Sequence, residues 1–234
     1  MQVLGHRGSP TAHPENSLAS FAAALDGGAD GIEVDVRLTA DGVAVCCHDD
    51  DLSRVGGAVR SVQSATWADL RHVRPGGEPV PRLVDVAALC AGRGLLVLDL
   101  KPSPRGAALL RAALAAVRLG GVPDADVVAS SFDDRLMDLL AVRRPALARA
   151  TILDVGDPLL PALGRARRRG DAGLHLPLPT VLAQPSEVAA AQMPVRVWTV
   201  NRTVDAQLCG LAGVAAVISD VPGVLAAQLR PVAA

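Results

Sequence analysis

The stretch GIEVDVRLTADGVAVCCHD, residues 31–49, decides the fold. Apolar and polar residues alternate in its first half, so that Glu33 and Asp35 share one face, which is the period of a β-strand. An Ala-Asp-Gly turn signal follows, and after it a second apolar run. Such a short turn joins only antiparallel strands, so we expect a β-hairpin. Folding the hairpin about Asp41 brings His48 near Glu33 and sets a histidine beside two carboxylates.

Outward from this hairpin, short apolar runs alternate with segments of helical periodicity. Without the return arm of the hairpin there are eight expected strands, separated by expected helices. This is the pattern of a TIM (β/α)8 barrel with a β-hairpin and a short excursion, residues 50–82, after its second strand. An open doubly wound sheet is the alternative, but the strand count and the single-domain length of residues 1–234 favour the barrel. The strands are expected at residues 2–7, 32–37, 95–101, 127–130, 148–153, 173–176, 195–200 and 217–218, and the helices include 83–91, 105–119 and 180–192.

Composition argues against several classes of protein. The chain has 234 residues, half of them hydrophobic, and a net charge of −1, so it lacks the basic excess of a nucleic-acid-binding protein. The sequence contains no apolar run of about twenty residues that would predict a membrane span. It also contains no apolar or basic loop that would predict stable membrane association. We therefore expect a cytoplasmic protein, and the oligomeric state stays open. The cysteines form no CxxC pair and are expected to be free thiols in a reducing compartment: Cys46, Cys47, Cys90 and Cys209.

Polar side chains gather at the carboxyl ends of the expected strands, where the active site of such a barrel lies. Three carboxylates there would repel one another, and a hard divalent cation, Mg²⁺ or Ca²⁺, resolves this. An arginine and the only lysine of the chain would hold an anion such as phosphate. Two histidines titrate near neutrality and suit acid–base work, so the set predicts metal-assisted hydrolysis of a phosphodiester. The residues are His6, Arg7, Glu33, Asp35, His48, Asp99 and Lys101.

An ordered set of motifs makes the chain resemble the glycerophosphodiester phosphodiesterase family over its whole length. Each motif is weak alone, and their order is specific. The resemblance implies a TIM barrel that cleaves a small-molecule glycerophosphodiester to glycerol 3-phosphate and an alcohol, using one divalent metal ion, Mg²⁺ or Ca²⁺. The motifs are GHRG at 5–8, PENS at 14–17, EVDV at 33–36, TADG at 39–42, HD at 48–49, DLK at 99–101, SSF at 130–132 and WTVN at 198–201.

The same resemblance implies a role for each matching residue. Asn16 would tie the first loop together, and Trp198 would contact the glycerol or the leaving group. Which histidine is the acid, and whether water or the glycerol 2-hydroxyl attacks, stay open. The implied groups are the acid–base histidines His6 and His48, the metal ligands Glu33, Asp35 and Asp99, and the substrate-binding residues Arg7, Lys101, Trp198 and Asn16.

Two positions depart from the family pattern. Asp99 stands where the family usually has glutamate, and Asp51 where it usually has threonine, so metal affinity or leaving-group preference could differ. These departures keep two rivals in view: another phospholipase C-like phosphodiesterase, and a catalytically silent barrel that binds a phosphorylated ligand. The remaining histidines, His13, His72 and His175, are more typical of structural or surface positions, although His175 could reach the barrel mouth if its strand ends at Leu176.

Overall fold

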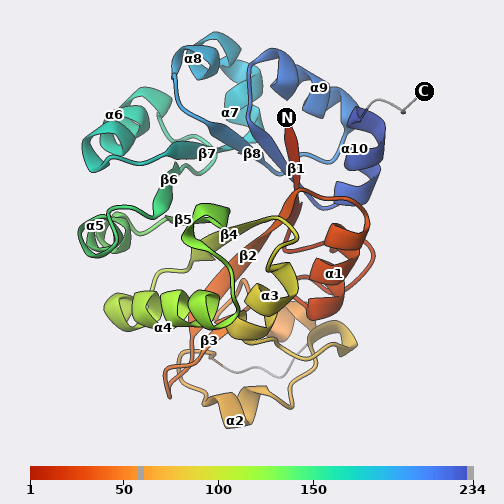
Figure 1. The fold of residues 1–234 in the computed structure, drawn as a ribbon, viewed down its shortest axis with the longest axis vertical. Coiled ribbons are helices and arrows are strands. Elements are labelled where there is room, and N and C mark those ends of the chain that lie inside the picture. The colour runs from red at the N-terminus through yellow and green to blue at the C-terminus, as the bar shows by residue number, and fades with distance from the viewer. Residues whose placement is uncertain (57–60, 231–234) are drawn as a thin grey trace.

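A closed parallel barrel forms the centre of the protein. The structure is a computed structural model that describes residues 1–56 and 61–230. The described strands form one nine-stranded sheet in the order β1-β9-β8-β7-β6-β5-β4-β2-β3, and an additional pairing of β1 with β2 closes it. Only the β2–β3 pairing is antiparallel among these, which confirms the expected hairpin on a TIM barrel. Figure 1 shows the helices arranged around the strands.

The elements follow the expected alternation of strand and helix. The strands are β1 (Gln2–His6), β2 (Gly31–Leu38), β3 (Ala44–Cys46), β4 (Leu95–Leu100), β5 (Val127–Ser131), β6 (Ala148–Ile152), β7 (Gly173–Pro177), β8 (Val195–Trp198) and β9 (Ala216–Ser219). The helices are α1 (Leu18–Asp26), α2 (Trp67–Leu70), α3 (Leu83–Cys90), α4 (Gly106–Leu119), α5 (Asp134–Arg143), α6 (Leu159–Arg169), α7 (Leu178–Ala183), α8 (Pro185–Ala190), α9 (Thr203–Leu211) and α10 (Pro222–Leu229).

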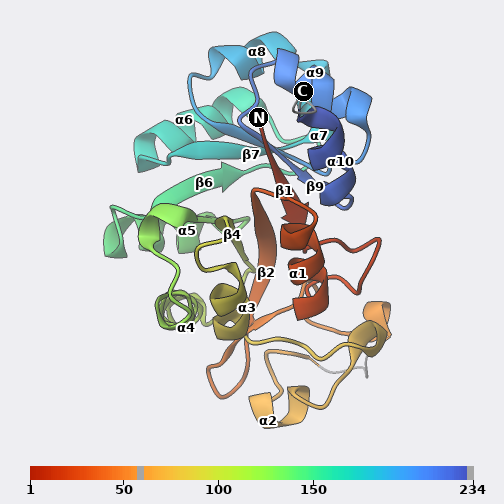
Figure 2. The ribbon, with the colours of Figure 1, turned by 45° about the vertical axis from the view of Figure 1, so that its right-hand side comes forward.

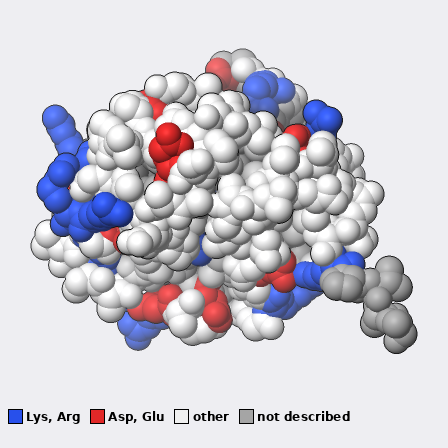
Figure 3. Space-filling view, turned by 90° about the horizontal axis from the view of Figure 1, so that it is seen from above, with Lys and Arg blue, Asp and Glu red and all other residues white. Residues whose placement is uncertain are grey.

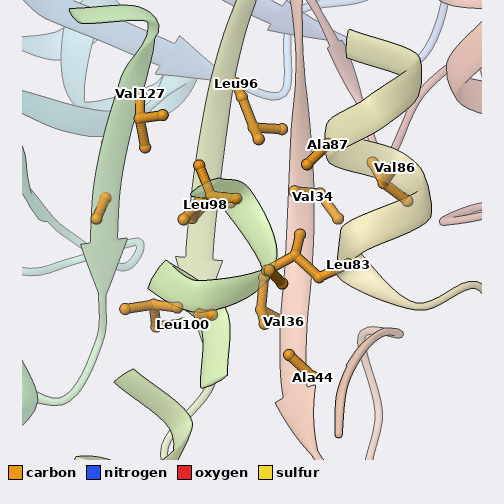
Figure 4. Close-up of a cluster of buried hydrophobic side chains, with 14 of the residues drawn as sticks. Val34, Val36, Ala44, Leu83, Val86, Ala87, Leu96, Leu98, Leu100 and Val127 are labelled. Carbon is orange, nitrogen blue, oxygen red and sulfur yellow. The ribbon is translucent and has the colours of Figure 1, made fainter. Parts of the chain in front are cut away.

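The two faces of each strand bury different cores. Outward side chains of β2 and β4, such as Val34 and Leu98, pack against Leu83 and its neighbours on α3 (Figure 4). Because side chains alternate along a strand, the intervening residues point into the barrel. A small aliphatic cluster that includes Val97 and Ile218 fills the barrel interior. Asp99 follows Val97 by two positions, so the interior packing supports the polar residues at the strand ends.

The excursion after the hairpin makes its own small core. Trp67 packs on a buried cluster that includes Val45, Cys47 and Leu70. Cys46 lies instead in the main core, because adjacent residues of a strand face opposite sides. The four cysteines are free and buried. Figures 1 and 2 both place α2 at the opposite end of the molecule from α8; residues 57–60 of the excursion lie outside the described residues.

One expected helix is wrong. The sequence predicts a single helix over residues 180–192, but the structure has α7 and α8, which meet at Gln184. Gln184 has φ −134° and ψ 52°, outside the helical region. The next residue is Pro185, and proline disfavours the helical conformation of the residue before it. The break is therefore the local effect of one proline.

The face of the protein seen from the α8 end has no large basic patch among its described residues. Figure 3 shows that most of this face is neither acidic nor basic, with arginines gathered at its edges. The arginines at the end of α6 are partly paired, since Arg169 contacts Asp134, Asp138 and Asp171. No helix in residues 1–56 and 61–230 combines the length and apolar character needed to cross a membrane.

Candidate active site

A cavity of about 290 Å³ opens at the carboxyl ends of the barrel strands. Every site residue predicted from the sequence lines it except Asn16. The structure thus brings together side chains from β1, β2, β4 and β8, and His48 from the segment after β3. The lining residues are His6, Arg7, Glu33, Asp35, His48, Asp99, Lys101, Ser130, Phe132, Ile152, Asp154, His175, Trp198 and Ile218.

Three buried carboxylates stand together on neighbouring strands. Glu33 and Asp35 come from β2 and Asp99 from β4, and the register pairs Asp35 directly with Asp99. One carboxylate oxygen from each residue lies within 4.8 Å of the corresponding oxygens of the other two. Burial raises the pKa of Glu33 to about 7, and the neighbouring charge of Asp35 adds to this rise. A cation bound among these carboxylates would stabilise their ionised forms and relieve their mutual repulsion.

The donor set fits a hard divalent metal ion. All three candidate ligands are carboxylate oxygens, which suit Mg²⁺ or Ca²⁺. The Oδ1 atom of Asp99 is buried and has no hydrogen-bond partner among the described residues. Burial raises the pKa of Asp99, with Lys101 opposing this and Asp35 adding to it. An unpartnered carboxylate oxygen beside two further carboxylates is the environment that a bound cation would satisfy.

Two cations neutralise part of this acidic cluster. The Lys101 Nζ atom lies 2.6 Å from Asp35 Oδ1 and 2.6 Å from Asp99 Oδ2. Arg7 Nε lies 3.1 Å from Asp35 Oδ2, and the Arg7 backbone N–H donates to Glu33 Oε2. Burial opposes ionisation of Asp35, but the charges of Lys101 and Arg7 outweigh it and hold the pKa of Asp35 well below its usual range.

The loop after β1 is tightly constrained where it presents Arg7. Arg7 has φ 53° and Gly8 φ 91°, both in the left-handed region. A Cβ on Gly8 would lie 2.4 Å from Ser20 Oγ, so only glycine fits there. The Ser20 hydroxyl in turn donates to the Arg7 carbonyl oxygen. The GHRG motif thus fixes the Arg7 backbone against α1.

His6 is held by Asp220, an acid after the last strand to which the sequence analysis gave no catalytic role. Its Nδ1 lies 2.7 Å from Asp220 Oδ1. The other oxygen, Asp220 Oδ2, accepts from Asn201 Nδ2 at 2.7 Å. Burial lowers the pKa of His6, but the hydrogen bond to Asp220 and the charge of Glu33 outweigh it, so the pKa is raised above 6.5. The signal was present in the sequence, because Asp220 directly follows the last barrel strand.

His48 has a similar partner but the opposite shift. Its Nδ1 lies 2.8 Å from Asp49 Oδ1, and Asp49 Oδ2 accepts from Arg54 Nε. Burial lowers the pKa of His48 below 6.5, and Asp35, which raises it, does not compensate. Asp35 is also the strongest charge acting on His48, whereas the hairpin pattern pointed to Glu33. In both histidines Nδ1 is engaged by an aspartate, so Nε2 is the nitrogen left for a substrate.

Asn16 and Glu15 hydrogen-bond to the side chains of cavity residues and hold them in place. Asn16, 3% exposed, donates from Nδ2 to Asp35 Oδ2 at 2.7 Å and accepts the Asp35 backbone N–H at Oδ1. Glu15 accepts from Arg7 and from Arg54, and so joins the loop after β1 to the excursion. Asn16 therefore ties its loop to a candidate metal ligand.

The far wall of the cavity holds two residues, His175 and Phe132, to which the sequence analysis gave no role. His175 lines the cavity because β7 runs on to Pro177 and its inward face carries this side chain. Phe132 meets Trp198 edge to face, with ring centroids 6.2 Å apart. For Phe132 the SSF motif was the available signal, whereas nothing in the pattern around His175 distinguished it from a core histidine.

Comparison with known proteins places these features in a family. The model of the glycerophosphoryl diester phosphodiesterase family matches residues 6–224. An uncharacterized protein of Bacillus subtilis is 28% identical over 98% of both chains. A probable glycerophosphodiester phosphodiesterase 1 of Mycobacterium tuberculosis is 47% identical over 74 residues, which are 32% of this chain and 27% of that relative.

A solved structure extends the likeness to the fold. The chain superposes on a phosphodiesterase of Oleispira antarctica, solved in complex with the product sn-glycerol-3-phosphate, with a TM-score of 0.89 and 26% identity. The superposition covers 98% of this chain and 96% of the other. The family match spans nearly the whole barrel, including every residue of the acidic cluster. The chain therefore belongs to the glycerophosphoryl diester phosphodiesterase family.

Proposed function

We propose that this protein hydrolyses glycerophosphodiesters to glycerol 3-phosphate and an alcohol, with one divalent metal ion, Mg²⁺ or Ca²⁺. The observation that carries the proposal is one cavity lined by three clustered carboxylates, two cations and two histidines that are each held by an aspartate. Product binding in the similar Oleispira antarctica protein supports glycerol 3-phosphate as the product.

In this proposal the cations of the chain bind the substrate. Arg7 and Lys101 line the cavity beside the carboxylates and present fixed positive charge to a phosphate. Glu33, Asp35 and Asp99 would hold the metal ion. That ion would supply Lewis-acid stabilisation of the charge that develops on the phosphate oxygens. Trp198 gives the substrate an apolar surface at the end of β8.

The two histidines divide the proton transfers. His48, whose pKa is lowered, is neutral near pH 7 and accepts the proton of the attacking oxygen. His6, whose raised pKa favours its protonated form more than in a free histidine, donates a proton to the leaving alkoxide. Asp49 and Asp220 hold the two rings by their Nδ1 atoms, which leaves both Nε2 atoms for these transfers.

A bell-shaped pH dependence follows from this division. The base His48 must be neutral, so kcat/KM rises with pH through a pKa below 6.5; the acid His6 must be protonated, so the rate falls through a pKa above 6.5. We expect the alkaline limb to flatten in His6→Ala, within whatever activity remains. Profiles are measured at saturating metal, which keeps Glu33 ionised. Retention of the full alkaline limb in His6→Ala would contradict the assignment.

The reaction itself is tested with a panel of glycerophosphodiesters that differ in the alcohol. Phosphorus NMR of the reaction mixture is expected to show glycerol 3-phosphate, with Mg²⁺ or Ca²⁺ present. The same spectra decide the nucleophile, because attack by the glycerol 2-hydroxyl passes through a cyclic phosphate and attack by water does not. Release of the alcohol phosphate in place of glycerol 3-phosphate would contradict the proposed bond cleavage.

One observation favours the silent phosphate-binding barrel as a second candidate. Lys101 bridges Asp35 and Asp99 at 2.6 Å each, so two of the three carboxylates already have a cationic partner. A barrel of this kind would bind glycerol 3-phosphate without turnover and without a metal requirement. The unpartnered Asp99 Oδ1 and the raised pKa of Glu33 favour the enzyme instead.

A further inference from the structure

His175 stands across the barrel from the acidic cluster. The eight parallel strands close in the circular order β1-β2-β4-β5-β6-β7-β8-β9. In that circle β7 is the fourth strand from β2 in either direction, so His175 faces the strand that carries Glu33 and Asp35. All three side chains line the same cavity. A substrate held at the acidic cluster therefore extends toward His175.

Apart from the exposed Asp154, which follows β6, the wall around His175 is largely apolar and includes two buried nitrogen atoms. Ile152, Ile218 and the ring of Trp198 line the cavity on the strands next to β7 and beyond. His175 is 1% exposed, and its Nε2 is buried without a hydrogen-bond partner in residues 1–56 and 61–230. The Nε1 of Trp198 is buried and unpartnered in the same way. Buried polar atoms normally have partners, so a ligand that supplies them gains affinity.

The chemistry of this wall suits a hydroxyl group. Burial, with the charge of Arg196, lowers the pKa of His175 to about 3, so its imidazole is neutral at physiological pH. A neutral imidazole offers one donor and one acceptor, and the indole N–H of Trp198 offers one donor. Within the described part of the chain, no carboxylate hydrogen-bonds His175 as Asp220 does His6, so His175 lacks the arrangement of the two acid–base histidines.

We propose that His175, with Trp198 beside it, hydrogen-bonds the hydroxyl groups of the glycerol moiety and so makes the site specific for glycerol-containing phosphodiesters. This inference rests on the proposed function for the identity of the substrate. His175 is a specificity-determining residue in it, because it reads a part of the substrate that does not react. The phosphate lies at the acidic cluster and the glycerol lies across the cavity.

A binding cycle tests this role without turnover. Calorimetry measures sn-glycerol 3-phosphate and propyl phosphate, which lacks both hydroxyls, on the wild-type chain and on His175→Leu, with Mg²⁺ present. We expect the leucine variant to bind glycerol 3-phosphate about tenfold more weakly and propyl phosphate less than twofold differently, since one hydrogen bond is lost only in the first case. Equal weakening of both ligands would overturn the proposal, as would failure of the wild-type chain to prefer glycerol 3-phosphate.

A second variant and a turnover arm separate this proposal from the proposed function. His175→Gln keeps a donor and an acceptor and is expected to recover part of the preference; it also serves if the leucine variant does not fold. In turnover, His175→Leu should lose kcat/KM on a glycerophosphodiester but not on bis(4-nitrophenyl) phosphate, which contains no glycerol. Absence of any diester hydrolysis by the wild-type chain would refute the proposed function alone, because the binding cycle still decides the role of His175.

Discussion

Replacing His48 with alanine is expected to lower kcat for glycerol 3-phosphate release by about 10²- to 10⁴-fold, the usual contribution of a general base. His48 lines the cavity, is held by Asp49 and is kept neutral near pH 7 by burial. Its side chain is 36% exposed, so the change removes no core packing. Affinity for glycerol 3-phosphate should change little, because the proposed function assigns phosphate binding to Arg7, Lys101 and the metal site.

The matched control is His13→Ala, which removes an exposed histidine outside the cavity and is expected to keep full activity. Comparing kcat with product affinity separates an enzyme from a binding protein. If His48→Ala kept wild-type kcat, His48 would not be the base, and the division of roles between the two histidines would be wrong.

Replacing Asp35 with asparagine is expected to weaken metal binding by about 100-fold or more, since even residues that only support a metal ligand commonly contribute 10- to 100-fold. Asp35 stands at the centre of the acidic cluster and contacts Lys101, Arg7 and Asn16. The variant removes a candidate metal ligand and leaves two buried cations less well compensated. We also expect a loss of about 1–3 kcal/mol in the free energy of unfolding.

Stability is measured by thermal unfolding. Metal affinity is measured by calorimetry at a temperature well below the unfolding midpoint, so that the protein is folded in the titration. Glu187→Gln is the control, because Glu187 is an exposed acid on α8 outside the cavity. The control should match the wild-type chain in both measurements. Unchanged metal affinity in Asp35→Asn would remove Asp35 from the ligand set.

The sequence predicted the acidic cluster best, because the alternation of side chains along a strand and the order of strands in the barrel both bear on it. The alternation around Glu33 and Asp35 predicted a strand with both acids on one face, and the barrel pattern then predicted Asp99 beside them; the β2–β4 register places Asp35 opposite Asp99. The only lysine, Lys101, lies among these acids. These features follow from local periodicity and from the rule that strand ends share one rim.

The hydrogen-bond partners of several site residues depend on loop conformation and on barrel closure, and local periodicity did not predict them. The pairing of His6 with Asp220 joins residues 214 positions apart through the closure of the barrel. Asn16 was expected to tie its loop together; the sequence did not indicate that its side chain, on a backbone with φ 56°, donates to Asp35. The sequence favoured a structural or surface position for His175 and left the barrel mouth open, since its flanking leucines resemble those of any buried strand. The split of α7 from α8 depends on one proline within an otherwise helical pattern.

The most direct test of the account is turnover of a glycerophosphodiester by the same preparation before chelation, after removal of metal, and after reloading with Mg²⁺ or Ca²⁺. We expect glycerol 3-phosphate release to fall to background on chelation and to return with one of the two ions, because in the proposed function Glu33, Asp35 and Asp99 would hold an ion that stabilises the reacting phosphate. Release that continues unchanged in the chelated protein would contradict metal-dependent hydrolysis at this site.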